Sequence, residues 1–192
     1  MGLAEVQTAL ARLYTDAAWR AEFFAAPPRV GATVGLTAAE AQQLTQLQTA
    51  EVNFFALTLH GKRLNEIHKL LPLAHRAFGR QFDDYFRAYA ETYLPDGTKK
   101  HLDDALAFAV FLPAAQTDAP AWARDVLRYE TARLIALQPK PCFIARRFRH
   151  ALKPLLRSLN QAEAAPVVVS QSSGAVWCRP TPDASLRHWL WR

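Results

Sequence analysis

Apolar residues recur at intervals of three to four positions through the first 137 residues, and this spacing predicts amphipathic helices. Thr37 followed by Glu40 is typical of a capping box at a helix start. A long central helix, or a pair of helices that meet near Gly61, continues to Pro72, where a new helix can begin. We therefore expect five to seven helices within residues 3–137.

An aromatic stripe follows that proline. Its members are Phe78, Phe82, Tyr85, Phe86 and Tyr89. Aromatic side chains at this spacing share one face of a helix, so we expect them to lie in the core. The segment at 94–97, Leu-Pro-Asp-Gly, is typical of a turn and should end this helix.

The pattern changes after residue 140, from helical periodicity to short β-branched and aromatic runs. The runs at 166–170, 175–179 and 185–191 predict a small antiparallel sheet. Residues 142–149 are expected to pair with it as a strand, and residues 150–159 to form a helix. The predicted fold is mainly α, with an N-terminal bundle of five to seven helices and a small C-terminal antiparallel β-sheet. We expect a helical domain at residues 1–140 and a small α+β region with a β-hairpin at 141–192.

The composition is that of a folded protein, because 51% of the residues are hydrophobic and 21% are charged. No apolar run reaches the length of about 18 residues that a membrane helix needs, and the N-terminus lacks a signal-peptide pattern. We expect no membrane segment and a cytoplasmic location. Cys142 and Cys178 are the two cysteines, and their spacing favours buried thiols in a reducing compartment over a disulfide or a zinc site.

Residues that could carry chemistry are scattered along the sequence. His68 and His75, for example, are separated by Pro72, so the pattern does not place them on one helix face. The sequence contains neither a glycine-rich phosphate loop nor a nucleophile elbow. We therefore expect no catalytic residues, no metal site and no cofactor, and we interpret the chain as a binding protein rather than an enzyme.

The net charge of +6 is concentrated in two blocks. Residues 61–80 carry five basic residues and one acidic residue, and residues 141–192 carry eight and two. The candidate partner-binding residues in these blocks are Lys62, Arg63, Lys69, Arg146, Arg147, Arg149 and Arg157. Basic residues at a sheet edge suit an acidic peptide that adds a strand, and on charge alone they suit nucleic acid equally well.

Several motifs resemble a bacterial helical family long labelled a putative DNA-binding domain. They are Leu59-His-Gly-Lys-Arg63, Leu70-Leu-Pro72, Phe82-x-x-Tyr85-Phe86-x-x-Tyr89, Phe111-Leu-Pro113, Asp125-x-x-Arg128-x-Glu130, Ala175-Val-Trp-Cys-Arg179 and Arg187-His-Trp189. Lys62-Arg63 stands about where this family has Arg-Asn, and this form resembles a divergent group of uncharacterised proteins. The resemblance covers roughly residues 55–191.

Several members of that family are partner proteins of multinuclear non-haem iron oxidases that modify ribosomally made peptides. The resemblance implies that this chain is a non-catalytic partner that binds a precursor peptide, such an oxidase, or both. The alternative is a nucleic-acid-binding regulator that uses the basic patches at 62–76 and 146–157. Against the alternative, a helix-turn-helix is not evident, and +6 is a modest charge for a dedicated DNA-binding protein.

Overall fold

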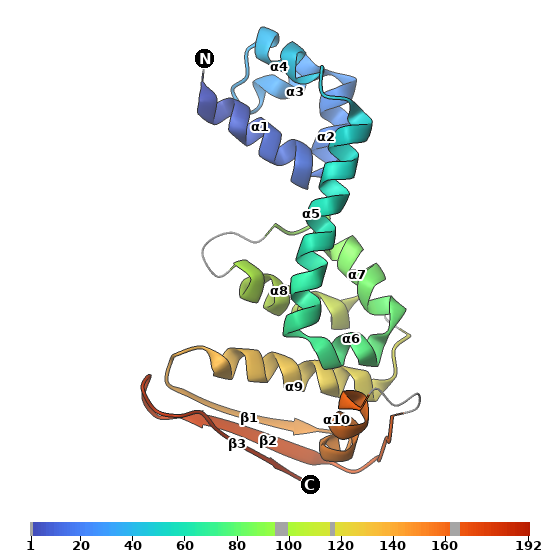
Figure 1. Ribbon diagram of the computed structural model, residues 1–192, viewed down its shortest axis with the longest axis vertical. Coiled ribbons are helices and arrows are strands. Elements are labelled where there is room, and N and C mark those ends of the chain that lie inside the picture. Colours follow the sequence, from blue (N-terminus) through green and yellow to red (C-terminus); the bar gives the residue numbers. More distant parts are fainter. Residues whose placement is uncertain (1, 95–99, 116–117, 162–165) are drawn as a thin grey trace. The chain divides into compact units, whose positions relative to one another are not determined.

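A computed structural model describes residues 2–94, 100–115, 118–161 and 166–192 (Figure 1). Its helices are α1 (Leu3–Thr15), α2 (Ala17–Ala25), α3 (Pro27–Ala32), α4 (Ala38–Leu44), α5 (Thr49–Leu70), α6 (Pro72–Phe78), α7 (Arg80–Ala90), α8 (Lys100–Ala114), α9 (Ala121–Leu137) and α10 (Leu152–Asn160). Its strands are β1 (Cys142–Phe148), β2 (Ser173–Arg179) and β3 (Arg187–Trp191). The strands form one antiparallel sheet in the order β1-β2-β3. The predicted fold class, mainly α with a small C-terminal antiparallel sheet, is confirmed.

Local start signals divide the N-terminal part more finely than its periodicity predicts. The described part of residues 3–137 holds nine helices, where five to seven were expected. The Asp16 side chain accepts a hydrogen bond from Trp19 N at 2.9 Å and so starts α2 directly after α1. Thr37 and Glu40 form the predicted capping box at the start of α4. Helix α5 runs through Gly61 without a break.

Two residues redirect the chain between α5 and α7. Pro72 occupies the first turn of α6, where its missing N–H removes no helical hydrogen bond. Gly79 follows α6 with a φ of +57°, in the left-handed region that favours glycine. In the predicted aromatic stripe, Tyr85 is half-buried and the other four side chains are buried. The turn expected at 94–97 lies outside the described residues except for Leu94.

Contacts divide the chain into two compact units, and the boundaries fall within α5 and α7. Unit 1 comprises Met1–Leu64 and Arg87–Leu94, and unit 2 comprises Asn65–Phe86 and Pro95–Arg192. The predicted domain boundary at residue 140 is a different division of the chain and stays a prediction. The core of unit 1 contains the buried residues Ala9, Leu13, Trp19, Phe23, Val30, Leu36, Ala41 and Val52.

Helix α9 is the centre of unit 2, because it contacts α6, α8, α10, β1 and β2. It lies along one face of the sheet (Figure 1), where Tyr129 packs on Trp177 with ring centroids 5.4 Å apart. A second aromatic group joins α7 to α8, since Phe108 meets Phe82 and Phe86 edge-on at 5.0 and 5.3 Å. The resulting apolar core packs the sheet of unit 2 against its helices.

The C-terminal predictions are mostly confirmed, with two corrections. The expected strand at 142–149 is β1, and the expected helix at 150–159 is α10. Residues 166–170 were predicted to be a strand, but this segment lies outside the sheet. Its backbone bonds elsewhere, because Val167 N donates to Ser158 Oγ at 3.0 Å and Val169 O accepts from Ala151 N at 3.0 Å. The two cysteines are free and half-buried rather than fully buried.

Candidate binding surface on the C-terminal sheet

The sheet has two different faces because side chains alternate along each strand. The face that meets α9, here the inner face, includes Phe148, Ala175 and Trp177, each at most 1% exposed. Cross-strand pairing defines the opposite face, here the outer face. It is formed by Phe143, Ala145, Arg147, Gly174, Val176, Cys178, Arg187, Trp189 and Trp191.

Large aromatic side chains are exposed on the outer face. Phe143 is 74% exposed, Trp189 is 50% exposed and Trp191 is 51% exposed. Two exposed arginines accompany them, since Arg187 shares a cross-strand row with Phe143, and Arg147 shares one with Trp191. Aromatic residues and arginine are the types enriched in the cores of protein interfaces. The outer face therefore has the composition of a binding surface.

A glycine on β2 makes room for one of the tryptophans. A Cβ built on Gly174 would lie 2.5 Å from Cζ2 of Trp191, so the indole rests against the backbone of β2. Beside it is a hollow of about 440 Å³, and its lining includes Arg146, Arg147 and Arg192. The structure thus places predicted basic residues next to an aromatic side chain that the charge pattern did not identify.

Adjacent arginines of β1 belong to opposite faces of the sheet. Arg147 is paired with Gly174 on the outer face, whereas Arg146 is paired with Ala175 on the inner face. Arg146 also lines a second hollow of about 130 Å³ together with Leu127 and other residues of α8 and α9. The arginine cluster read from the sequence is therefore split between the two faces of the sheet, although both residues are exposed and both line the hollow beside Trp191.

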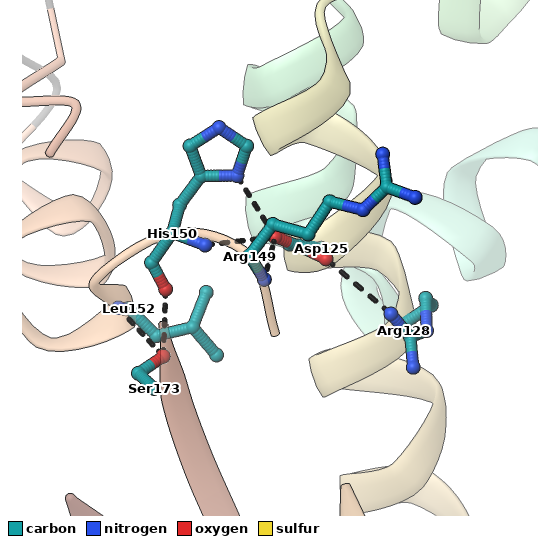
Figure 2. Close-up of polar contacts among 6 residues, drawn as sticks. All are labelled: Asp125, Arg128, Arg149, His150, Leu152 and Ser173. Atoms are coloured by element: carbon teal, nitrogen blue, oxygen red, sulfur yellow. Dashed lines mark hydrogen bonds and ion pairs between the residues drawn. The ribbon is translucent and has the colours of Figure 1, made fainter. Parts of the chain in front are cut away.

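A buried carboxylate holds the turn that follows β1 (Figure 2). Asp125 of α9 is 3% exposed, and its Oδ2 accepts hydrogen bonds from Arg149 N at 2.9 Å and His150 N at 3.2 Å. His150 Nδ1 lies 2.9 Å from the same oxygen. Ser173 Oγ donates to the His150 carbonyl at 2.6 Å and accepts from Leu152 N at 3.3 Å. The Arg149 backbone is fixed in this way, while its side chain is exposed.

The first two basic candidates lie on α5 within unit 1. Arg63 donates a hydrogen bond to the Tyr93 carbonyl at 2.9 Å, and its guanidinium lies 5.8 Å from the centroid of the Tyr89 ring. Such contacts fix the side chain within the unit. Lys62 is exposed.

The basic residues of unit 2 outside the sheet differ in whether their side chains bind other groups of the protein. Lys69 is exposed and forms an ion pair with Glu66, with Nζ 2.6 Å from Oε1. Arg76 donates to the Leu159 carbonyl at 2.7 Å, which ties α6 to α10. Arg157 of α10 is exposed. The exposed basic residues of unit 2 are therefore spread over many elements, including α7, α8 and α9 as well as β1, β3, α5 and α10.

Glu130 is a second buried carboxylate on α9, and it caps another helix. It is 1% exposed and accepts hydrogen bonds from Leu73 N at 3.0 Å and Ala74 N at 2.7 Å, in the first turn of α6. Burial raises the pKa of Glu130 to about 7, although the two backbone N–H groups act in the opposite direction. Both carboxylates of the Asp125-x-x-Arg128-x-Glu130 motif thus bind backbone N–H groups.

Sequence reasoning missed two groups of residues. It selected candidates by charge and therefore did not include the exposed aromatic rings. The spacing Arg187-x-Trp189-x-Trp191 indicates that these three side chains lie on one face of a strand. Sequence reasoning also left His68 and His75 apart, whereas the structure stacks their rings.

None of the described helices has the length and apolar character needed to cross a membrane. No protein-family model matches the chain, and no curated protein is similar to it.

Proposed function

We propose that this protein is a non-catalytic partner that binds an acidic peptide segment on the outer face of its C-terminal sheet. The observation that carries the proposal is the set of exposed rings, Phe143, Trp189 and Trp191, beside Arg147 and Arg187. Covering exposed apolar surface contributes about 25 cal/mol per Å² buried. The guanidinium groups supply charge-assisted hydrogen bonds to carboxylates, which fix the orientation of the bound segment.

The edge of the sheet supports the same mode of binding. Strand β3 is last in the order β1-β2-β3 and pairs with β2 on one side. An extended peptide can add to such an edge, where main-chain hydrogen bonds give affinity and alternate side chains give specificity. Strand β3 presents Arg187, Trp189 and Trp191 on one face, so every second side chain of an added strand would meet these basic and aromatic neighbours.

The family resemblance supports a specific setting for this binding. In that setting the peptide is the precursor on which a multinuclear non-haem iron oxidase acts, and the oxidase is the second partner. This chain would supply recognition and the oxidase would supply the chemistry. The net charge of +6 favours acidic partners through long-range attraction.

Fluorescence anisotropy with three labelled probes tests the proposal. The probes are a short peptide that alternates Glu and Val, a matched peptide that alternates Lys and Val, and single-stranded oligo(dT). We expect the acidic peptide to bind most tightly. The double variant Arg147→Glu with Arg187→Glu should weaken its binding by roughly 100-fold, since hydrogen bonds to charged groups are worth about 1.5–3 kcal/mol each.

A matched charge reversal away from the sheet controls for net charge. Arg29→Glu with Lys100→Glu changes two exposed basic residues on α3 and α8. This control should bind the acidic peptide far more tightly than the sheet variant does. Equal affinities of the two double variants would refute the assignment of binding to the outer face.

Nucleic-acid binding is the second candidate function, and the same surface supports it. Aromatic rings on a sheet can stack bases, and neighbouring arginines can contact phosphates. Under this alternative oligo(dT) binds more tightly than the acidic peptide, and its affinity falls steeply as salt rises. The three-probe comparison therefore decides between the two functions.

A further inference from the structure

Two histidines and an aspartate converge in unit 2, one from each of three successive helices. His68 lies in the last turn of α5, His75 lies on α6, and Asp83 lies in the first turn of α7. Oδ1 of Asp83 is 2.8 Å from Nε2 of His68 and 3.7 Å from Nε2 of His75. The imidazole rings are stacked, with centroids 3.9 Å apart and planes inclined by 15°. Two ring nitrogens therefore lie within 3.7 Å of one carboxylate oxygen.

We propose that His68, His75 and Asp83 form a binding site for a divalent transition-metal ion. Donor atoms about 2.0–2.2 Å from a shared ion lie roughly 3–3.5 Å apart in tetrahedral or octahedral geometry. The observed separations of 2.8 and 3.7 Å lie on either side of that range, so small side-chain movements would admit an ion. Two imidazole nitrogens and one carboxylate oxygen are a donor set that suits Zn²⁺ and Fe²⁺.

The backbone holds these three donors close before any ion arrives. Helix α6 begins at Pro72, two positions after α5 ends at Leu70, and Gly79 with its φ of +57° turns the chain into α7. Fully buried Phe82 packs against both imidazoles, with ring centroids 5.8 Å from His68 and 5.4 Å from His75. Such support reduces the entropy lost when ligands are fixed around an ion.

The basic residues that follow each histidine in sequence are held by other groups. Lys69 pairs with Glu66, and Arg76 donates to the Leu159 carbonyl. An incoming cation therefore meets two imidazole rings and a carboxylate rather than either of these two side chains.

The donors are also accessible to solvent. The side chains of His68, His75 and Asp83 are 25%, 37% and 30% exposed. An ion could therefore enter from solvent and keep positions open for water or for a donor from a partner, as catalytic and bridging zinc sites do. This inference does not rest on the peptide-binding proposal, because it concerns other residues.

Calorimetric titration of the chelator-treated full chain with Zn²⁺ tests the site. We expect a single ion per chain, and Co²⁺ should give a visible absorption spectrum typical of imidazole coordination. His75→Asn and Asp83→Asn should each weaken Zn²⁺ binding by more than about 100-fold, since loss of even an outer-shell partner costs about 10–100-fold. His101→Asn, which alters an exposed histidine of α8, should retain the wild-type affinity.

The variants separate metal binding from folding. Asp83→Asn keeps the size of the side chain and its capacity to accept a hydrogen bond from His68, so circular dichroism should show an intact helical protein. If His75→Asn does not fold, Asp83→Asn alone decides the matter. Absence of Zn²⁺ and Co²⁺ binding by the wild type, or Zn²⁺ binding that Asp83→Asn leaves unchanged, would overturn the proposal.

Discussion

The buried carboxyl group of Glu130 makes the stability of this protein depend on pH in a defined direction. Burial raises its pKa to about 7, against an ordinary value of 4.5. Between these values the folded protein holds a proton that the unfolded chain releases. The stabilisation from this proton is therefore complete below pH 4.5 and is lost as the pH rises through about 7. The difference between about 7 and 4.5, at 1.36 kcal/mol for each pH unit, corresponds to about 3 kcal/mol.

Glu130→Gln tests this reasoning, because the amide cannot ionise but still offers an oxygen to the N–H groups of α6. We expect the unfolding free energy of the variant minus that of the wild type to rise by about 3 kcal/mol from pH 4.5 to about pH 8. Urea unfolding followed by circular dichroism at several pH values measures it, and the subtraction removes groups that titrate in both proteins. The exposed Glu22→Gln serves as control and should show no such trend. A difference for Glu130→Gln that stays constant with pH would refute the argument.

Three further changes test other parts of unit 2. Asp125→Ala leaves two backbone N–H groups and the His150 ring without their acceptor. Urea unfolding should therefore show that the free energy of unfolding falls by about 3–5 kcal/mol. The exposed Asp118→Ala serves as control and should change it little. Gly174→Val should displace the Trp191 indole from β2, which a shifted tryptophan emission spectrum would report; an unchanged spectrum would contradict the contact. Burial lowers the pKa of His188 below its ordinary value of 6.5. The contribution of this residue to stability is therefore present above pH 6.5 and is lost as the pH falls below 6.5. In the same urea unfolding assay, His188→Gln should reduce the loss of stability at acid pH.

The sequence predicts best those elements whose signals are local. The Thr37–Glu40 capping box and the helix start at Pro72 depend on residues within one turn, and both are confirmed. The strand expected at 166–170 fails for the opposite reason. Its β-branched residues suit a strand, but Val167 and Val169 bond to Ser158 and Ala151 instead of to another strand. Strand propensity describes a segment and carries no information about the partner it will find.

The binding surface was predictable only in part, because it depends on which face of the sheet α9 covers. The charge pattern selects Arg146 and Arg147 together, but side chains alternate along β1, so the two arginines belong to opposite faces of the sheet. Trp189 and Trp191 would be core residues if a helix covered the outer face. The histidine cluster illustrates a related difficulty, since Pro72 indicates a helix break, and a tight break is what lets the rings stack.

The Asp125-x-x-Arg128-x-Glu130 motif has a structural role. Asp125 holds the turn between β1 and α10, and Glu130 caps α6, so the motif joins α9 to three neighbouring elements. Residues with these roles stabilise the fold and do not determine its binding partner, because proteins with one fold can serve different partners. The motif therefore stabilises the fold. Partner binding is expected at the exposed arginines and aromatic rings of the outer face, which the three-probe experiment tests.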